Sequence, residues 1–221
     1  MTTYVRTVAS IVYKDVLVEL RTRETVVAGA IFALLVAIVF AFALQLAPVS
    51  ARGVAPGLLW VTLAFAGVFS FGRLFAAERD RGALDGLLLA PVDPTALYVA
   101  KVVSSVAFML VVLAVTLPAY AVLLNAPLLS LALLPAALIG LAAFAALGTL
   151  FAAVAISGRS RDVLLPILFL PLAIPVVLTA TGATRLVLAG SPSGDALGVL
   201  VACTALYLTA GVLLFAYTVE E

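Results

Sequence analysis

The residue types that most often carry chemistry are scarce in this chain of 221 residues. It contains no histidine, so it supplies neither an imidazole base nor a histidine ligand for a metal ion. Its single cysteine, Cys203, stands in an apolar run, which excludes disulfide frameworks and favours a buried thiol acting as a small hydrophobe. No GxxxxGK[ST] phosphate-binding loop is present. We therefore predict no catalytic residue and no metal site, and we expect another subunit to bind any ATP that is used.

The densest group of ionisable side chains lies between residues 78 and 94. Charged residues come first, followed by leucines and prolines, and the side chains of interest are Glu78, Arg79, Asp80, Arg81, Asp85, Leu87, Leu88 and Pro91. Arg81 and Asp85 have the i,i+4 spacing that supports a short helix, which Pro91 would end. The leucines of such a helix lie outside the apolar segments. The pattern therefore predicts either a docking helix for a cytoplasmic partner or a helix resting on lipid headgroups.

The elements that position this loop must be membrane-spanning helices. Hydrophobic residues make up 66% of the chain and charged residues 10%, whereas a soluble domain is about half apolar and about a quarter charged. Lipid is therefore the solvent, and in lipid each spanning segment satisfies its own backbone hydrogen bonds as a helix. We predict an all-α integral membrane protein with a single domain over residues 1–221. Its six predicted spans are residues 26–47, 56–77, 95–124, 131–156, 163–181 and 196–219.

Residues 1–25 have a different pattern from the spans. An apolar stripe recurs there at helical spacing, formed by Val5, Val8, Val12, Val16 and Leu20. Arg6, Lys14 and Arg21 fall towards the opposite side, while Asp15 and Glu19 lie nearer the edge of the stripe. The charged stretch is too long for a signal peptide, and a span of full length follows it. We interpret residues 1–25 as an uncleaved amphipathic helix on the membrane surface; the alternative is a solvated extension.

The distribution of basic residues predicts the orientation. Basic residues precede the first span and flank the second and fourth loops, whereas only Arg52 and Arg185 lie on the other side. By the positive-inside rule, both termini and the 78–94 loop are cytoplasmic. Because the basic residues are spread along the chain rather than clustered, we expect no nucleic acid partner.

Few polar or helix-breaking residues fall within the spans. Lys101 lies about two turns into the third span, where snorkelling would bring its ammonium to the surface. Arg185 lies beyond the predicted fifth span. That span contains Pro166, Pro171 and Pro175, which must bend or break it. This predicts either a gating element or a fixed kink.

The fourth span is rich in alanine and glycine. Ala136 with Gly140, and Gly148 with Ala152, have small-xxx-small spacing. We expect this spacing to serve close helix packing within the subunit, and a dimer face is the alternative.

Several stretches together resemble one known family. Residues 56–60 read PGLLW, 73–75 RLF, 82–91 GALDGLLLAP, 100–102 AKV and 164–175 LLPILFLPLAIP. This combination resembles the cytochrome c maturation protein CcmB family, also called the haem exporter permease. The resemblance extends over the whole chain in length, number of spans and order of motifs.

That resemblance implies an ABC-2-like permease in which residues 1–25 form the elbow helix before the six spans. In the family, the loop after the second span is a coupling helix that rests on the ATPase subunit, so residues 78–94 would make that contact. The resemblance further implies a homodimer in the bacterial inner membrane with CcmA-like ATPase subunits, which hold ATP and Mg²⁺. CcmC, CcmD and the haem chaperone CcmE are the other implied partners. ATP hydrolysis would drive haem export or the release of haem-loaded CcmE.

The residues of this chain offer little for holding haem iron. Besides Cys203, the sulfur ligand within the spans is Met109, and the tyrosines, including Tyr98, Tyr120 and Tyr207, are better explained by packing or interface positions. We therefore expect no cofactor bound in this chain and no enzyme activity of its own, with haem handled by the complex. The alternatives are a membrane scaffold that transports nothing and a permease of the same architecture that exports another hydrophobic compound.

Overall fold

The computed structural model describes residues 2–45, 50–75, 93–156 and 161–220. Within these residues the chain is helical, and six helices are long and apolar enough to cross a membrane. In chain order, the elements are α1 (Thr2–Thr22), α2 (Glu24–Gln45), α3 (Ala51–Arg73), α6 (Pro94–Leu123), the 3₁₀ turn η1 (Leu131–Leu133), α7 (Leu134–Ile156), α8 (Arg161–Leu188) and α9 (Gly194–Glu220). The prediction of an all-α integral membrane protein is confirmed.

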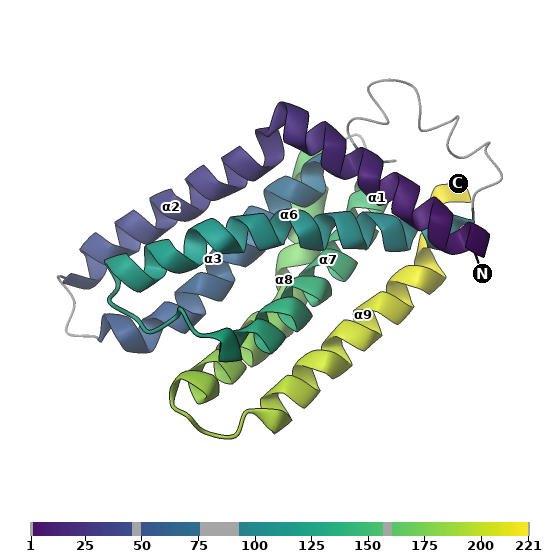
Figure 1. Ribbon diagram of the computed structural model, residues 1–221. Helices are drawn as coiled ribbons and strands as arrows, with labels where there is room; N and C mark the ends of the chain where they lie inside the picture. The colour runs from purple at the N-terminus through teal and green to yellow at the C-terminus, as the bar shows by residue number, and fades with distance from the viewer. Residues whose placement is uncertain (1, 46–49, 76–92, 157–160, 221) are drawn as a thin grey trace.

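Two helices form the centre of the bundle. We compared the share of residues that are buried in the most apolar part of each span. This share is 72% in the α7 span and 61% in α3, and it is 17–28% in the other four spans. α7 packs against α3, α6, α8 and α9, while α2 packs on α3 and α6 from outside. α1 crosses one end of the bundle, where both chain termini also lie (Figure 1). We call this end the α1 end.

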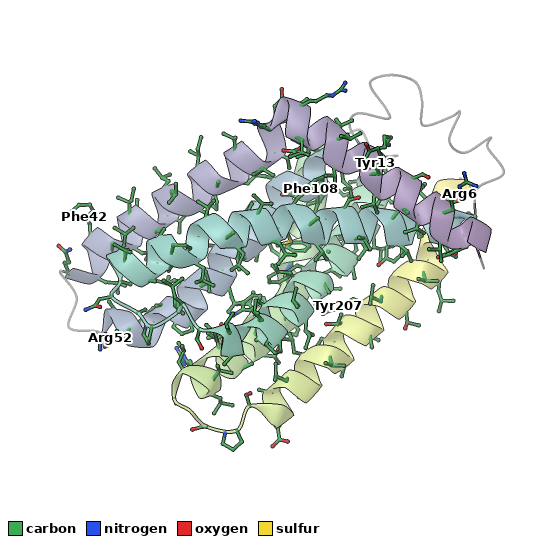
Figure 2. All side chains as sticks on the ribbon, viewed as in Figure 1. Arg6, Tyr13, Phe42, Arg52, Phe108 and Tyr207 are labelled. Atoms are coloured by element: carbon green, nitrogen blue, oxygen red, sulfur yellow. The ribbon has the colours of Figure 1, made fainter. Side chains whose placement is uncertain are left out.

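Outward-facing side chains leave most of the bundle surface apolar. Phe42 on α2 is 66% exposed and points away from the bundle (Figure 2). Val122 on α6, Leu178 on α8 and Leu206 on α9 are exposed in the same way. In water such a surface would be strongly unfavourable, and in a bilayer it meets acyl chains.

Close packing at the centre depends on glycines of α7. A Cβ atom at Gly140 would overlap the Trp60 ring of α3, and one at Gly148 would overlap the Phe71 ring. These rings pack edge-on or tilted against aromatic neighbours, with centroids 6.0 Å apart for Trp60 and Phe144 and 5.3 Å for Phe71 and Phe169. The small residues of the fourth span therefore serve packing within the subunit, as predicted.

Three of the predicted span boundaries are wrong by four residues or more, and one is the end of the second span, which lies at Arg73 rather than at residue 77. α3 begins at Ala51 rather than at residue 56, so Pro56 lies inside the helix instead of starting it. α8 continues to Leu188 rather than ending at residue 181. Arg185 therefore lies in the last turn of a spanning helix and not beyond it.

Contacts between α3 and α8 account for the longer α8. The indole Nε1 of Trp60 donates to Oγ1 of Thr184 at 2.9 Å, and Arg185 donates to the carbonyl of Gly53 at 3.1 Å. The helix ends where Gly190 adopts a left-handed backbone with φ +67°, a conformation that glycine tolerates. The polar residues Thr184 and Arg185 are thus part of the helix, because both contact α3.

α1 and α2 are joined by a single-residue bend. Arg23 has φ 55°, which is uncommon for a residue with a side chain, and it separates Thr22 from Glu24. The carboxylate of Glu19 accepts a hydrogen bond from the backbone N–H of Val26 at 2.8 Å. This bond satisfies one of the N–H groups that the start of a helix leaves without a partner. The bend allows α1 to lie over α6 while α2 enters the bundle (Figure 1).

Candidate functional site at the base of the 78–94 loop

The residues predicted to contact an ATPase lie mostly outside the described part of the chain. This applies to Glu78, Arg79, Asp80, Arg81, Asp85, Leu87, Leu88 and Pro91. The structure does describe both ends of the segment. Leu74 and Phe75 follow α3, and Asp93 precedes α6. Asp93 caps α6, because its carboxylate accepts from the backbone N–H of Thr95 at 2.9 Å.

A buried lysine joins these elements. The Nζ atom of Lys101, in the second turn of α6, donates to the carbonyl of Leu74 at 3.0 Å and lies 3.1 Å from the Asp15 carboxylate of α1. It also lies 5.2 Å from the centre of the Phe75 ring. We call Lys101, Asp15, Leu74 and Phe75 the Lys101 cluster. It connects α1, the end of α3 and the start of α6 at one point.

The prediction that Lys101 snorkels to the surface is wrong. Its side chain is 1% exposed and that of Asp15 is 9% exposed. The charge is held inside the protein because a carboxylate, a carbonyl dipole and an aromatic face surround it. Asp15 accordingly faces α6. Sequence reasoning noted both charges, but they are far apart in the chain and only the fold brings them together.

A second ion pair lies beside an apolar groove. Arg73, at the end of α3, forms a salt bridge with Glu24 at the start of α2. Next to it, α2 and α8 both pack on α3 and leave a groove of about 500 Å³. We call this the α2–α3–α8 groove, and its lining includes Thr25, Ala28, Phe65, Phe69, Arg73 and Pro166.

Comparisons with known proteins show the family. The model of the family described as CcmB protein matches residues 6–220. The chain belongs to the CcmB family. It is 33% identical over 181 residues to heme exporter protein B of Pseudomonas aeruginosa, covering 80% of each chain. It is also 29% identical over 210 residues to heme exporter protein B of Bradyrhizobium diazoefficiens, covering 92% of each chain. Heme exporter protein B of Paracoccus denitrificans is 35% identical over 155 residues, which is 68% of this chain and 70% of that one.

The three prolines predicted to bend the fifth span of this CcmB-family chain lie within one continuous helix. α8 runs from Arg161 to Leu188 without interruption through Pro166, Pro171 and Pro175. Pro166 lines the groove, whereas Pro171 and Pro175 are exposed on the bundle surface. The hydroxyl of Tyr207 on α9 donates to the Leu172 carbonyl at 2.7 Å, between the second and third prolines. The helix is therefore unbroken, and its role in gating stays a prediction.

Met109 and Cys203 of this CcmB-family chain lie on different helices, α6 and α9. Met109 is 1% exposed and belongs to the core, where it packs near Gly67 of α3. Cys203 is partly exposed on α9. Tyr98 and Tyr120 are fully buried, with hydroxyl contacts of 2.9 Å to the Ala146 carbonyl and 2.7 Å to the Thr62 hydroxyl. These two tyrosines are packing residues, as one of the predicted alternatives stated.

Proposed function

We propose that this chain is the membrane-spanning permease subunit of an ABC complex for cytochrome c maturation. In this proposal, a CcmA-like ATPase docks on residues 78–94, and ATP hydrolysis there drives haem export or the release of haem-loaded chaperone. The relatives named heme exporter protein B support the haem-related role. The chain itself acts as a mechanical coupler, with ATP and Mg²⁺ held by the ATPase.

The Lys101 cluster is the observation that carries this proposal. A loop that receives force from an ATPase needs rigid attachment at both ends. Lys101 supplies such attachment, because its ammonium contacts the end of α3, while its own helix starts directly after the loop. The same ammonium pairs with Asp15, so α1 is attached at the same point. Force applied to the loop would therefore reach α1, α3 and α6 together.

The assembly around the chain is also part of the proposal. We place the protein in the bacterial inner membrane with both termini and the α1 end cytoplasmic, as the distribution of basic residues predicts. Two copies would associate with two CcmA-like ATPase subunits, and CcmC, CcmD and CcmE would complete the complex.

Two substitutions in the 78–94 loop test the coupling role. Asp85→Lys reverses a charge, and Leu88→Asp places a carboxylate where an apolar contact is predicted. Each is expected to reduce co-purification of the ATPase and the yield of mature cytochrome c, while the spans remain folded. Normal ATPase recovery and normal cytochrome c maturation in both variants would sink the proposal.

An ATPase-dead partner distinguishes the permease from a scaffold. If the chain couples ATP hydrolysis to haem handling, substituting the catalytic residues of the ATPase abolishes cytochrome c maturation even though the complex still assembles. A scaffold would still support maturation in that background. For the two loop variants of this chain, Asp85→Lys and Leu88→Asp, the matched control is Arg6→Met at an exposed position on α1. It is expected to change neither assembly nor activity.

A further inference from the structure

The α2–α3–α8 groove has an apolar body and a charged mouth. Its volume of about 500 Å³ is within the range of about 300–1,000 Å³ that ligand pockets usually have. Phe65 and Phe69 line it and are 42% and 49% exposed, so they present aromatic surface to whatever fills the groove. Polar atoms come from Arg73 and Thr25 at the α1 end, where α3 ends and α2 begins.

The position of the charges matches the depth of lipid headgroups. Arg73 is the last residue of α3 and Glu24 is the first of α2, so the pair lies where both spans leave the hydrocarbon. Their side chains are 51% and 59% exposed, which leaves both accessible from the membrane interface. Basic positions between spanning helices at this depth are common sites for lipid headgroups.

Arg73 lines the mouth of the groove and pairs with Glu24 beside it, so both signs of charge meet there. A guanidinium can hold a phosphate while it also holds a carboxylate, since it has five N–H donors in a planar fork. Glu24 would repel a headgroup that carries only negative charge, whereas it would attract a primary ammonium. A headgroup with both groups therefore complements the pair better than an anion alone.

We propose that the groove binds one phosphatidylethanolamine molecule from the leaflet at the α1 end. Its phosphate contacts Arg73, its ammonium contacts Glu24, and one acyl chain lies along Phe65 and Phe69. Phosphatidylglycerol lacks the ammonium, and the quaternary ammonium of phosphatidylcholine has no N–H to donate. The acyl chain reaches Pro166, so the bound lipid touches the proline-containing helix α8.

Lipid titration of the full purified chain, followed by native mass spectrometry, tests this site. The wild type is expected to retain one phosphatidylethanolamine with an apparent affinity about tenfold above those for phosphatidylglycerol and phosphatidylcholine. Arg73→Gln is expected to weaken phosphatidylethanolamine binding about tenfold, and Glu24→Gln to remove the preference over phosphatidylglycerol. Arg52→Gln, an exposed arginine at the opposite end of the bundle, is the matched control and should leave binding unchanged.

A variant that fills the groove without changing its charges completes the test. Ala28→Trp is expected to prevent retention of the lipid while thermal unfolding shows a folded bundle. Equal affinity for the three lipids, unchanged binding in Arg73→Gln or in Ala28→Trp, or binding of haem in place of lipid would each overturn the proposal. The test requires no ATPase, so its outcome is independent of the proposed function.

Discussion

At the scale of single residues, the most informative side chain is Lys101. A charge with 1% exposure inside a spanning helix is costly unless every direction offers a favourable partner. Asp15, the Leu74 carbonyl and the Phe75 ring meet that requirement from two other elements. The contact with Leu74 also places a cation at the end of α3, where the helix dipole favours one.

Removing one partner of this ion pair is expected to be more damaging than removing both. Lys101→Met leaves the buried Asp15 carboxylate paired with Lys14, whose ammonium lies 3.1 Å away on a side chain that is 47% exposed, and should still lower the free energy of unfolding by about 3 kcal/mol. The double variant Asp15→Asn with Lys101→Met should recover a large part of that loss, because no unpaired buried charge remains. Denaturant unfolding in detergent measures both, and Arg6→Met, expected to stay within about 0.5 kcal/mol, is the control. Additive losses in the double variant would contradict the pairing.

At the scale of the elements, the sequence predicts the spans well and their contacts poorly. The length of the apolar runs was enough to find six spans, because lipid requires helices of a minimum length. α3 starts before Pro56, at Ala51, because neighbouring helices allow a membrane-spanning helix to contain a proline. The end of α8 and the partner of Lys101 depend on residues distant in the chain, such as Trp60 and Asp15. No local pattern encodes those contacts.

The close approach of α7 to α3 gives a test at this scale. Gly148→Ala puts a methyl group into the space of the Phe71 ring, and the overpacking should lower the free energy of unfolding by about 1–3 kcal/mol. At Gly198 in α9, the added Cβ meets no atom within 4 Å, so Gly198→Ala should leave stability unchanged or slightly raised. Unfolding of the two variants in the same detergent provides the comparison. Equal stabilities would show that the α3–α7 contact is looser than described.

At the scale of the whole molecule, the six spans bring both chain termini to one end of the bundle (Figure 1). The loop between α8 and α9 lies at the opposite end. In a membrane, the two ends must therefore face different compartments. The distribution of basic residues predicts which end is cytoplasmic.

Cysteine labelling in intact cells measures this orientation. In a Cys203→Ser background, Ser191→Cys in the α8–α9 loop should react with a membrane-impermeant maleimide. Arg6→Cys on α1 should react only after the cells are made permeable, because the α1 end is predicted to be cytoplasmic. Both native positions are exposed, so burial does not account for a difference. The reverse labelling pattern would show that the α1 end is not cytoplasmic. A cytoplasmic ATPase could then not reach the 78–94 loop.

The enclosure of α7 has a consequence for how the protein is made. α7 packs against α8 and α9, which are synthesised after it, so the ribosome delivers this helix to the membrane before two of its neighbours exist. During that interval acyl chains must occupy the surface that protein later covers. A helix rich in Ala, Leu, Gly and Phe is stable in both surroundings, since it exposes few polar groups to lipid and its glycines admit the rings of α3. A polar residue whose hydrogen-bond partner belongs to α8 or α9 would lie in lipid without that partner until those helices are synthesised.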